Sequence, residues 1–280
     1  MGTDAAVIAR LRSAGCVFAE EEAGLLSAAA GSDAELDDMV GRRAAGEPLE
    51  QVIGWAEFYG LRIVVDPGVF VPRRRSEFLV AVAVEMIRER HASGRPVIAD
   101  LCCGTGALGL AVTAGLGGRG GGGPARPAPA SFIRLAELHA ADLDPAAVAC
   151  ARRNLEPAGG HVYVSDLFES LPPALRGRVD VLICNAPYVP TAQIAFMPAE
   201  AREHEALMAL DGGTDGLAIL RRAAAGAPGW LAPHGLMLVE TSERQAAPMA
   251  AVMAESGLAT RVHGDEWGAT VITGQAGQKR

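Results

Sequence analysis

The 280-residue chain lacks the cysteine patterns of a disulfide-stapled or zinc-binding protein. Its five cysteines are an odd number, and they include no Cys-x-x-Cys pair and no Cys/His ligand spacing. Small secreted domains carry paired cysteines, whereas thiols in a reducing compartment stay free. The sequence therefore predicts no disulfide framework, no metal site and a cytoplasmic location.

Long uncharged apolar runs are also missing. No stretch approaches the roughly 18 uncharged apolar residues of a helix that spans a bilayer, so no membrane span is expected. The beginning of the chain, MGTDAAVIARLRSAG, contains charges and no apolar core followed by a cleavage pattern. We therefore expect no signal peptide.

Positive charge is in deficit, because the formal net charge is -8 at pH 7. A protein of this sign is repelled by phosphate backbones unless it presents a local basic patch. The short basic run Arg73, Arg74 and Arg75 is typical of a solvated face, although beside a site it could meet an acidic partner or RNA. The overall charge disfavours direct binding to nucleic acid.

Hydrophobic residues make up 50% of the chain, enough for one large domain or for a medium domain and a small one. Apolar residues at helical spacing over 3–45 predict about three short helices, which Gly15 and Gly31 separate. Ser32 is the expected N-cap of the third helix, with Glu35 at its third position.

The residue composition changes after these predicted helices. Residues rich in β-formers surround the turn signal Asp66-Pro67-Gly68, which predicts a short hairpin between two domains. We therefore divide the chain into a helical domain (1–46), a linker with a hairpin (47–75) and an α/β domain (76–280).

Strands and helices alternate from Pro96 onward. The expected strands cover 96–100, 136–142, 161–166, 179–185 and 235–241, followed by an antiparallel pair at 259–264 and 268–274. This alternation predicts an α/β fold with a doubly wound, mostly parallel sheet that has helices on both faces. The low-complexity stretch 115–131 cannot bury apolar area, so a disordered surface loop is expected there.

A glycine turn follows the first of these strands. The segment ADLCCGTGALG places Asp100 at the end of the strand and Gly104, Gly106 and Gly109 behind it. Glycines let the backbone approach a ligand, and the next helix then begins facing that ligand. The spacing formally matches a dinucleotide fingerprint. An acid at the strand end, however, suits a cationic ligand such as S-adenosylmethionine better than a pyrophosphate.

Acidic residues also end the next two strands. Asp142 lies about 20 residues after Gly106 once the low-complexity loop is left out, the position of an acid that binds ribose hydroxyls in such folds. This spacing fits a dinucleotide and S-adenosylmethionine equally well. Asp144, just before Pro145, is the expected N-cap of the following helix. Asp166 is expected either beside an adenine or as a helix cap.

The fourth strand, 181–184, runs directly into Asn185-Ala186-Pro187-Tyr188. Ligands of open α/β sheets bind at this edge, so Asn185 should face the glycine turn. Its side-chain oxygen and the main-chain carbonyl of Ala186 could accept both N–H groups of a planar NH2 group. Pro187 restrains the backbone at residue 186, and the ring of Tyr188 could pack on the target group.

With these residues the chain resembles the HemK/PrmC family, the class I, Rossmann-like methyltransferases that modify a glutamine of peptide chain release factors. The similarity extends over the segments 42–80, 166–169, 211–217 and 238–245. Cys102 departs from the family by replacing the first glycine of its turn. Ala186 replaces a proline of the Asn-Pro-Pro-Tyr motif, and Ser76 replaces a threonine.

The resemblance implies methyl transfer from S-adenosylmethionine to a glutamine side chain of a release factor, with the helical domain recognising the substrate. It implies catalytic roles for Asn185, Ala186, Pro187 and Tyr188. It implies cofactor contacts from Asp100, Cys102, Gly104, Gly106, Asp142, Asp166 and Asn185. Glu240 also matches a family position, where a structural role is expected.

Three alternatives stay open at this point. Asn185 and Tyr188 would also serve a methyltransferase that acts on the N6 amine of adenine in DNA or RNA. The three glycines alone would fit an NAD-linked oxidoreductase. The changes at Cys102 and Ala186 would fit an adaptor that has lost catalysis.

Overall fold

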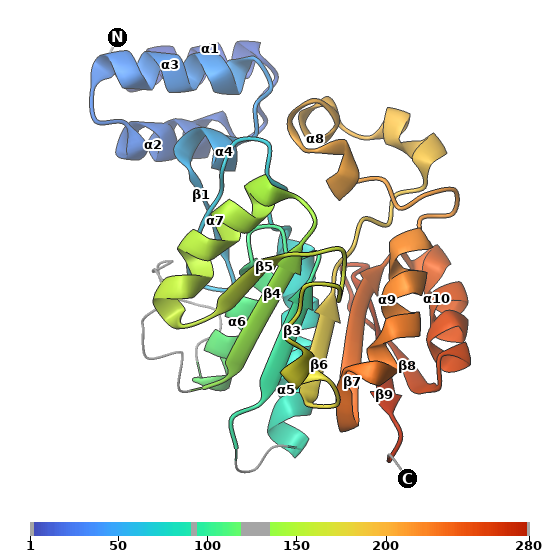
Figure 1. The fold of residues 1–280 in the computed structure, drawn as a ribbon. Helices are drawn as coiled ribbons and strands as arrows, with labels where there is room; N and C mark the ends of the chain where they lie inside the picture. Colours follow the sequence, from blue (N-terminus) through green and yellow to red (C-terminus); the bar gives the residue numbers. More distant parts are fainter. Residues whose placement is uncertain (1–2, 91–93, 119–134, 279–280) are drawn as a thin grey trace.

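The computed structural model describes residues 3–90, 94–118 and 135–278 (Figure 1). The chain begins with four helices, α1 (Thr3–Ser13), α2 (Ala19–Ala29), α3 (Asp33–Ala44) and α4 (Leu49–Ile53). Ser32 caps α3 as predicted, since its hydroxyl oxygen accepts the N–H of Glu35 at 3.2 Å. The sequence did not predict α4. Its Val52 packs into the same core as the three longer helices, so this core extends beyond residue 46.

The predicted hairpin exists, but its turn lies elsewhere. Strands β1 (Trp55–Phe58) and β2 (Leu61–Val64) are joined by Tyr59 and Gly60, whose φ angles are 52° and 70°. Two left-handed residues match the twist of a two-residue hairpin. Asp66-Pro67-Gly68 instead forms a separate turn after β2, in which the N–H of Val69 donates to the carbonyl of Asp66 at 3.1 Å.

A seven-stranded sheet forms the rest of the fold, in the order β5-β4-β3-β6-β7-β9-β8. Its strands are β3 (Val97–Leu101), β4 (Glu137–Asp142), β5 (His161–Val164), β6 (Val179–Cys184), β7 (Leu231–Thr241), β8 (Leu258–Gly264) and β9 (Thr270–Ala276). Five strands, β3 to β7, pair in parallel, and β9 runs antiparallel to both β7 and β8. The predicted doubly wound sheet with an antiparallel end is confirmed.

Helices cover both faces of the sheet. One face packs on α5 (Glu77–Arg90), α6 (Ala107–Leu116) and α7 (Pro145–Leu155), and the other on α9 (Ala218–Gly226) and α10 (Glu243–Glu255). Neighbouring residues of a strand face opposite sides, so Ile98 enters the first core and Ala99 the second. Of the loop predicted at 115–131, residues 115 and 116 belong to α6, and 119–131 lie outside the described residues.

Strand order reverses between β3 and β6. Leu101 of β3 pairs with Cys184 of β6, so Cys102 and Asn185 follow side by side at the carboxyl edge of the sheet. Crevices at such a reversal are where doubly wound sheets bind ligands. None of the described helices is both long enough and apolar enough to cross a membrane.

The segment between β6 and α9 crosses toward the helical start and contains α8 (Ala199–His204), which lies beside these helices in Figure 1. Arg43 forms an ion pair with Glu200 at 3.6 Å. The Glu205 carboxylate has a fully buried side chain and accepts Arg73 at 2.6 Å and 2.7 Å. These contacts hold the segment over the carboxyl ends of the strands.

Candidate active site

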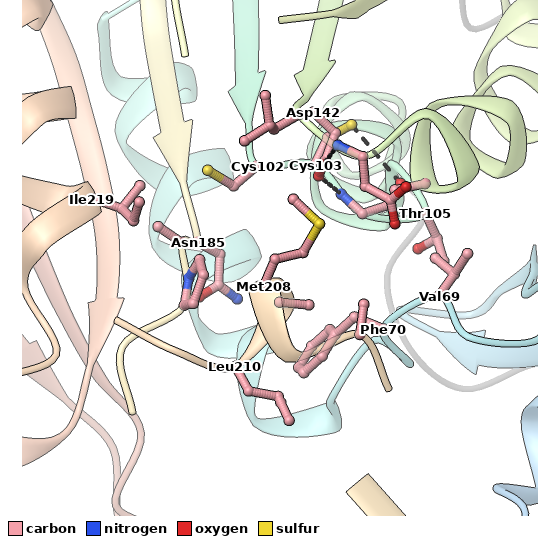
Figure 2. Close-up of a pocket in the computed structure, with 18 of the residues that line it drawn as sticks. Val69, Phe70, Cys102, Cys103, Thr105, Asp142, Asn185, Met208, Leu210 and Ile219 are labelled. Carbon is pink, nitrogen blue, oxygen red and sulfur yellow. Dashed lines mark hydrogen bonds between the residues drawn. The ribbon is translucent and has the colours of Figure 1, made fainter. Parts of the chain in front are cut away.

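A cavity of about 660 Å³ opens at the point where strand order reverses (Figure 2). Its wall combines the linker, the turn after β3, the ends of β4 to β7 and the segment before α9. The predicted site residues on this wall are Cys102, Gly104, Asp142, Asp166, Asn185, Ala186, Pro187 and Tyr188. Asp100 and Gly106 do not lie on it.

The turn after β3 is built from left-handed backbone. Cys102 and Gly104 have φ angles of 54°, and Gly106 has 77° and precedes α6. A Cβ on Gly106 would lie 2.8 Å from the Leu155 side chain, which explains the glycine there. Cys102 adopts this conformation with a side chain, at a cost of roughly 1–2 kcal/mol. The N–H of Gly104 is held by the carboxylate of Asp142 at 2.8 Å.

Asp142 is the acid best placed to bind a ligand. Its two oxygens accept the N–H groups of Gly104 at 2.8 Å and Asp144 at 2.9 Å. Burial raises the pKa of Asp142, and these backbone hydrogen bonds partly offset the rise. A carboxylate has about four acceptor positions, so Asp142 can still accept a hydroxyl group in the cavity. Asp144 caps α7 as predicted, accepting the N–H of Ala146 at 2.8 Å.

Asp100 lies beneath the turn instead of on the cavity wall. It is fully buried, and its Oδ2 accepts the N–H of Gly109 at 2.9 Å. No residue in the described part of the chain is hydrogen-bonded to Oδ1. Burial raises the pKa of Asp100 to about 7, against the lowering effect of the Gly109 hydrogen bond. Its side chain therefore supports the turn from below, and its contact with a ligand stays a prediction.

The raised pKa of Asp100 predicts a pH dependence of folding stability. Below about pH 4 the carboxyl is protonated in both the folded and the unfolded protein. Between about pH 4 and about pH 7 the Asp100 carboxyl is protonated in the folded protein but ionised in the unfolded protein. The stability that this bound proton gives the folded protein is therefore lost as the pH rises. Asp100→Asn removes this titration. From pH 5 to pH 8 the stability of the variant relative to the parent should rise by about 2–3 kcal/mol, measured by urea unfolding. Parallel pH profiles of the two proteins would contradict the prediction.

Asn185 lies at the end of β6, and Figure 2 shows its side chain extending into the cavity. Its Nδ2 donates to the hydroxyl oxygen of Ser76, at 3.4 Å. Ser76 is buried and ends a short 3-10 turn just before α5. The contact occupies the NH2 end of the amide, which leaves the carbonyl end of Asn185 as an acceptor.

The three residues after Asn185 are packed tightly against the segment 211–217. Ala186 is buried, with 1% exposure. A Cβ on Gly212 would lie 2.6 Å from the carbonyl oxygen of Pro187, and one on Gly216 would overlap the carbonyl of Tyr188. The hydroxyl of Tyr188 donates to Glu240 at 3.1 Å. Because its glycines carry no side chain, the segment 211–217 can pack directly against the backbone of residues 186–188.

Asp166 lines the cavity and is paired with Arg222 of α9 at 2.8 Å. Sequence reasoning missed Arg222, as well as the apolar wall formed by Phe70, Met208 and Leu210, which Figure 2 shows around the cavity. These residues come from loops or from a helix surface without a distinctive spacing. Among the described residues, no group of three histidine, cysteine or acidic side chains is arranged to hold a metal ion.

No protein-family model matches the chain. The release factor glutamine methyltransferase of Streptomyces coelicolor is 34% identical over 213 residues, which cover 76% of this chain and 69% of that protein. The chain belongs to the release factor glutamine methyltransferase family. It is a methyltransferase, so the oxidoreductase alternative is wrong.

The chain is also similar to a second kind of methyltransferase in sequence and to a solved methyltransferase in structure. A 4-amino-L-phenylalanine/4-methylamino-L-phenylalanine methyltransferase of Streptomyces pristinaespiralis is 32% identical over 220 residues, covering 78% of this chain and 69% of that protein. The solved structure of a methyltransferase from Pyrococcus furiosus superposes with a TM-score of 0.51 at 16% identity, covering 78% of this chain and 90% of that one. The second similarity supports the fold alone.

Proposed function

We propose that the protein transfers a methyl group from S-adenosylmethionine to the side-chain amide nitrogen of a glutamine in a peptide chain release factor. The observation that carries this proposal is the position of Asn185, in a chain of this family. Its amide extends into the cavity beside the glycine turn, with its NH2 end engaged by Ser76 at 3.4 Å. The carbonyl end is free to accept a substrate N–H.

The cavity residues fit S-adenosylmethionine. A volume of about 660 Å³ lies within the range of roughly 300–1,000 Å³ that is usual for small-molecule sites. Asp142 would hold the ribose hydroxyls with its remaining acceptor positions. Cys102, Gly104 and the start of α6 would surround the amino-acid part, and Asp166 would border the adenine. The cofactor supplies the electrophilic methyl group.

The protein's own contribution is to orient the amide nitrogen. That nitrogen is a weak nucleophile because its lone pair is delocalised into the carbonyl. The side-chain oxygen of Asn185 and the main-chain carbonyl of Ala186 would accept its two N–H groups and turn its face toward the methyl donor. Such positioning can lower a barrier by up to about 7–11 kcal/mol. The alkylated nitrogen loses its proton readily, so no dedicated base is required.

The proposal is tested by mass spectrometry of a release factor after incubation with the protein and isotopically labelled S-adenosylmethionine. One labelled methyl group should appear on a glutamine-containing peptide and fragment to that glutamine. Parallel reactions with adenine-containing DNA and RNA test the N6-adenine alternative. A release factor that stays unlabelled while another substrate is labelled would refute the proposal.

A second candidate is methylation of an aromatic amine on a free amino acid. The relative from Streptomyces pristinaespiralis supports it, and so does Arg75 on the cavity wall. The guanidinium lies 5.4 Å from the centroid of the Tyr188 ring and could meet a substrate carboxylate. 4-Amino-L-phenylalanine in the same assay separates this candidate from glutamine methylation.

Asp142 provides a prediction for cofactor binding. In Asp142→Asn, one acceptor oxygen becomes an NH2 group that faces the N–H of Gly104 or of Asp144. We expect the affinity for S-adenosylhomocysteine, measured by calorimetry, to fall about tenfold or more. The neighbouring Asp144→Asn is the control, because asparagine caps a helix as well as aspartate does. An equal loss in both variants would contradict a specific role of Asp142.

A further inference from the structure

Two segments of the cavity wall lie far apart in the sequence, and the proposed reaction depends on the distance between them. One is the turn after β3, residues 102–105, here called the cofactor turn. The other consists of the cavity-lining residues between Gly68 and Ser76, here called the linker wall. Reacting atoms must approach to about 3–3.5 Å, and a misplacement of about 1 Å can lower a rate about 100-fold. A side chain that holds the two segments together would therefore affect catalysis without touching a reactant.

Asn154 is such a side chain. It lies in the last turn of α7 and is buried, with 7% exposure. Its Oδ1 accepts the N–H of Val64, the last residue of β2, at 2.8 Å, and its Nδ2 donates to the carbonyl of Val64 at 3.0 Å. Nδ2 also donates to the carbonyl of Thr105 at 2.9 Å. One amide thus connects the end of the hairpin, α7 and the cofactor turn.

The geometry of these three hydrogen bonds makes the connection stiff. A side-chain amide has two N–H donors, and Asn154 directs one to each of the two segments. Its two contacts with Val64 reproduce the pair of bonds that a residue of a neighbouring antiparallel strand exchanges with its partner. Asn154 therefore restrains both the separation and the orientation of β2 relative to the cofactor turn.

Both residues that Asn154 contacts lead into the site. Thr105 belongs to the cofactor turn and lines the cavity. Val64 lies four residues before Gly68, where the chain reaches the cavity wall after the hairpin and continues to Phe70. A movement of β2 away from Thr105 would therefore be passed on to the linker wall within a few residues.

We propose that Asn154 is a positioning residue that sets the distance between the cofactor turn and the linker wall. The inference rests on the proposed function, in which the methyl donor lies at the cofactor turn. The target amide is then held by Asn185, which is hydrogen-bonded to Ser76 at the end of the linker wall. Asn154 would keep these two halves of the reaction in register from outside the cavity.

Asn154→Ala should lower kcat for glutamine methylation at least about tenfold, because the two segments can then shift relative to one another. The affinity for S-adenosylhomocysteine should stay within about threefold, since Asp142 and its hydrogen bond with Gly104 are retained. Asn154→Asp, assayed at pH 8, keeps the shape of the side chain, but the ionised carboxylate has no proton to donate to Thr105. It should lose kcat to a similar extent, also without a comparable loss of affinity.

Cys150→Ala is the matched control. Cys150 is buried one turn earlier on the same helix, and its Sγ donates to the same carbonyl of Val64, at 3.2 Å. A thiol has a single proton, so this contact ends on the hairpin and does not join it to the cofactor turn. Cys150→Ala should lower the thermal unfolding temperature and leave kcat within about threefold of the parent. A loss of kcat in Asn154→Ala no larger than that in Cys150→Ala would overturn the inference.

Hydrogen exchange provides a second measurement, which requires no methylated substrate. Residues 61–66 do not line the cavity, so a ligand there would not cover them directly. In the parent and in Cys150→Ala, saturating S-adenosylhomocysteine should slow amide exchange over 61–66, because the cofactor turn is connected to β2 through Asn154. Absence of this protection in the parent would overturn the inference, as would its persistence in Asn154→Ala. A parent protein that shows the protection but leaves a release factor unmethylated would count against the proposed function alone.

Discussion

Replacing Asn185 with alanine should lower kcat for glutamine methylation by about 10²–10³-fold, the usual effect of removing one preorganised hydrogen-bonding group from a reacting centre. The side chain extends into the cavity beside the glycine turn, and in the proposed reaction its carbonyl end would accept an N–H of the target amide. Without it, the target amide keeps only the Ala186 carbonyl as an acceptor and can rotate away from the methyl donor. Labelled methyl transfer to a release factor, followed by mass spectrometry, measures the loss.

The same variant should still bind S-adenosylhomocysteine, with an affinity reduced less than tenfold, because Asp142 and the glycine turn remain in place. Calorimetry on the purified variant provides this control, together with an unchanged thermal unfolding temperature. Asn185→Asp is the shape-matched comparison. It keeps an acceptor but loses the donor to Ser76, so its kcat should fall between those of the parent and the alanine variant. Methylation that persists undiminished in Asn185→Ala would reject the assignment of Asn185.

The sequence predicted the position of Asn185 because two simple patterns determine it. A short apolar run ends at Cys184, and in a doubly wound sheet the ends of the first and fourth strands meet where strand order reverses. The register Leu101–Cys184 places these ends side by side. The helix N-caps Ser32 and Asp144 were likewise predicted from the sequence, since each cap depends only on residues within one helical turn.

The direction of the Asp100 side chain was not predicted from the sequence. Side chains of a strand alternate between the two faces of the sheet, so a difference of one residue decides which face an acid lies on. β3 continues to Leu101, which directs Asp100 toward α6 and the N–H of Gly109. The sequence alone did not determine where the strand ends to within one residue.

The contacts that support the site could not be predicted from the sequence either, because they join segments that lie far apart in the chain. Glu240 lies on β7, Ser76 in the turn before α5 and Asn185 directly after β6, and only the assembled sheet brings them together. Arg222 reaches Asp166 from α9 across 56 positions of the chain. The segment 211–217 resembled a family segment, but its contact with the backbone of Pro187 and Tyr188 became visible only in three dimensions.

That contact predicts a large effect for Gly216→Ala. The φ angle of Gly216 is 79°, and an added Cβ would overlap the carbonyl of Tyr188 and the side chain of Gln245. Gln245 is itself anchored, because its Nε2 donates to the carbonyls of Tyr188 and Asp215 at 2.9 Å. The methyl group can be accommodated only if the backbone near Tyr188 and the segment 211–217 move apart. We expect the free energy of unfolding to fall by about 3 kcal/mol and kcat to fall at least tenfold.

Gly268→Ala separates the two causes of this loss. Gly268 has a φ angle of 82° in the turn between β8 and β9, and no heavy atom lies within 4 Å of where its Cβ would stand. Alanine there meets the same left-handed backbone without the overlap, so about 1 kcal/mol of stability should be lost and kcat should be unchanged. Urea unfolding and methylation assays on both variants measure the difference. Equal losses in the two would mean that the close approach of Gly216 to Tyr188 does not hold the catalytic backbone in place.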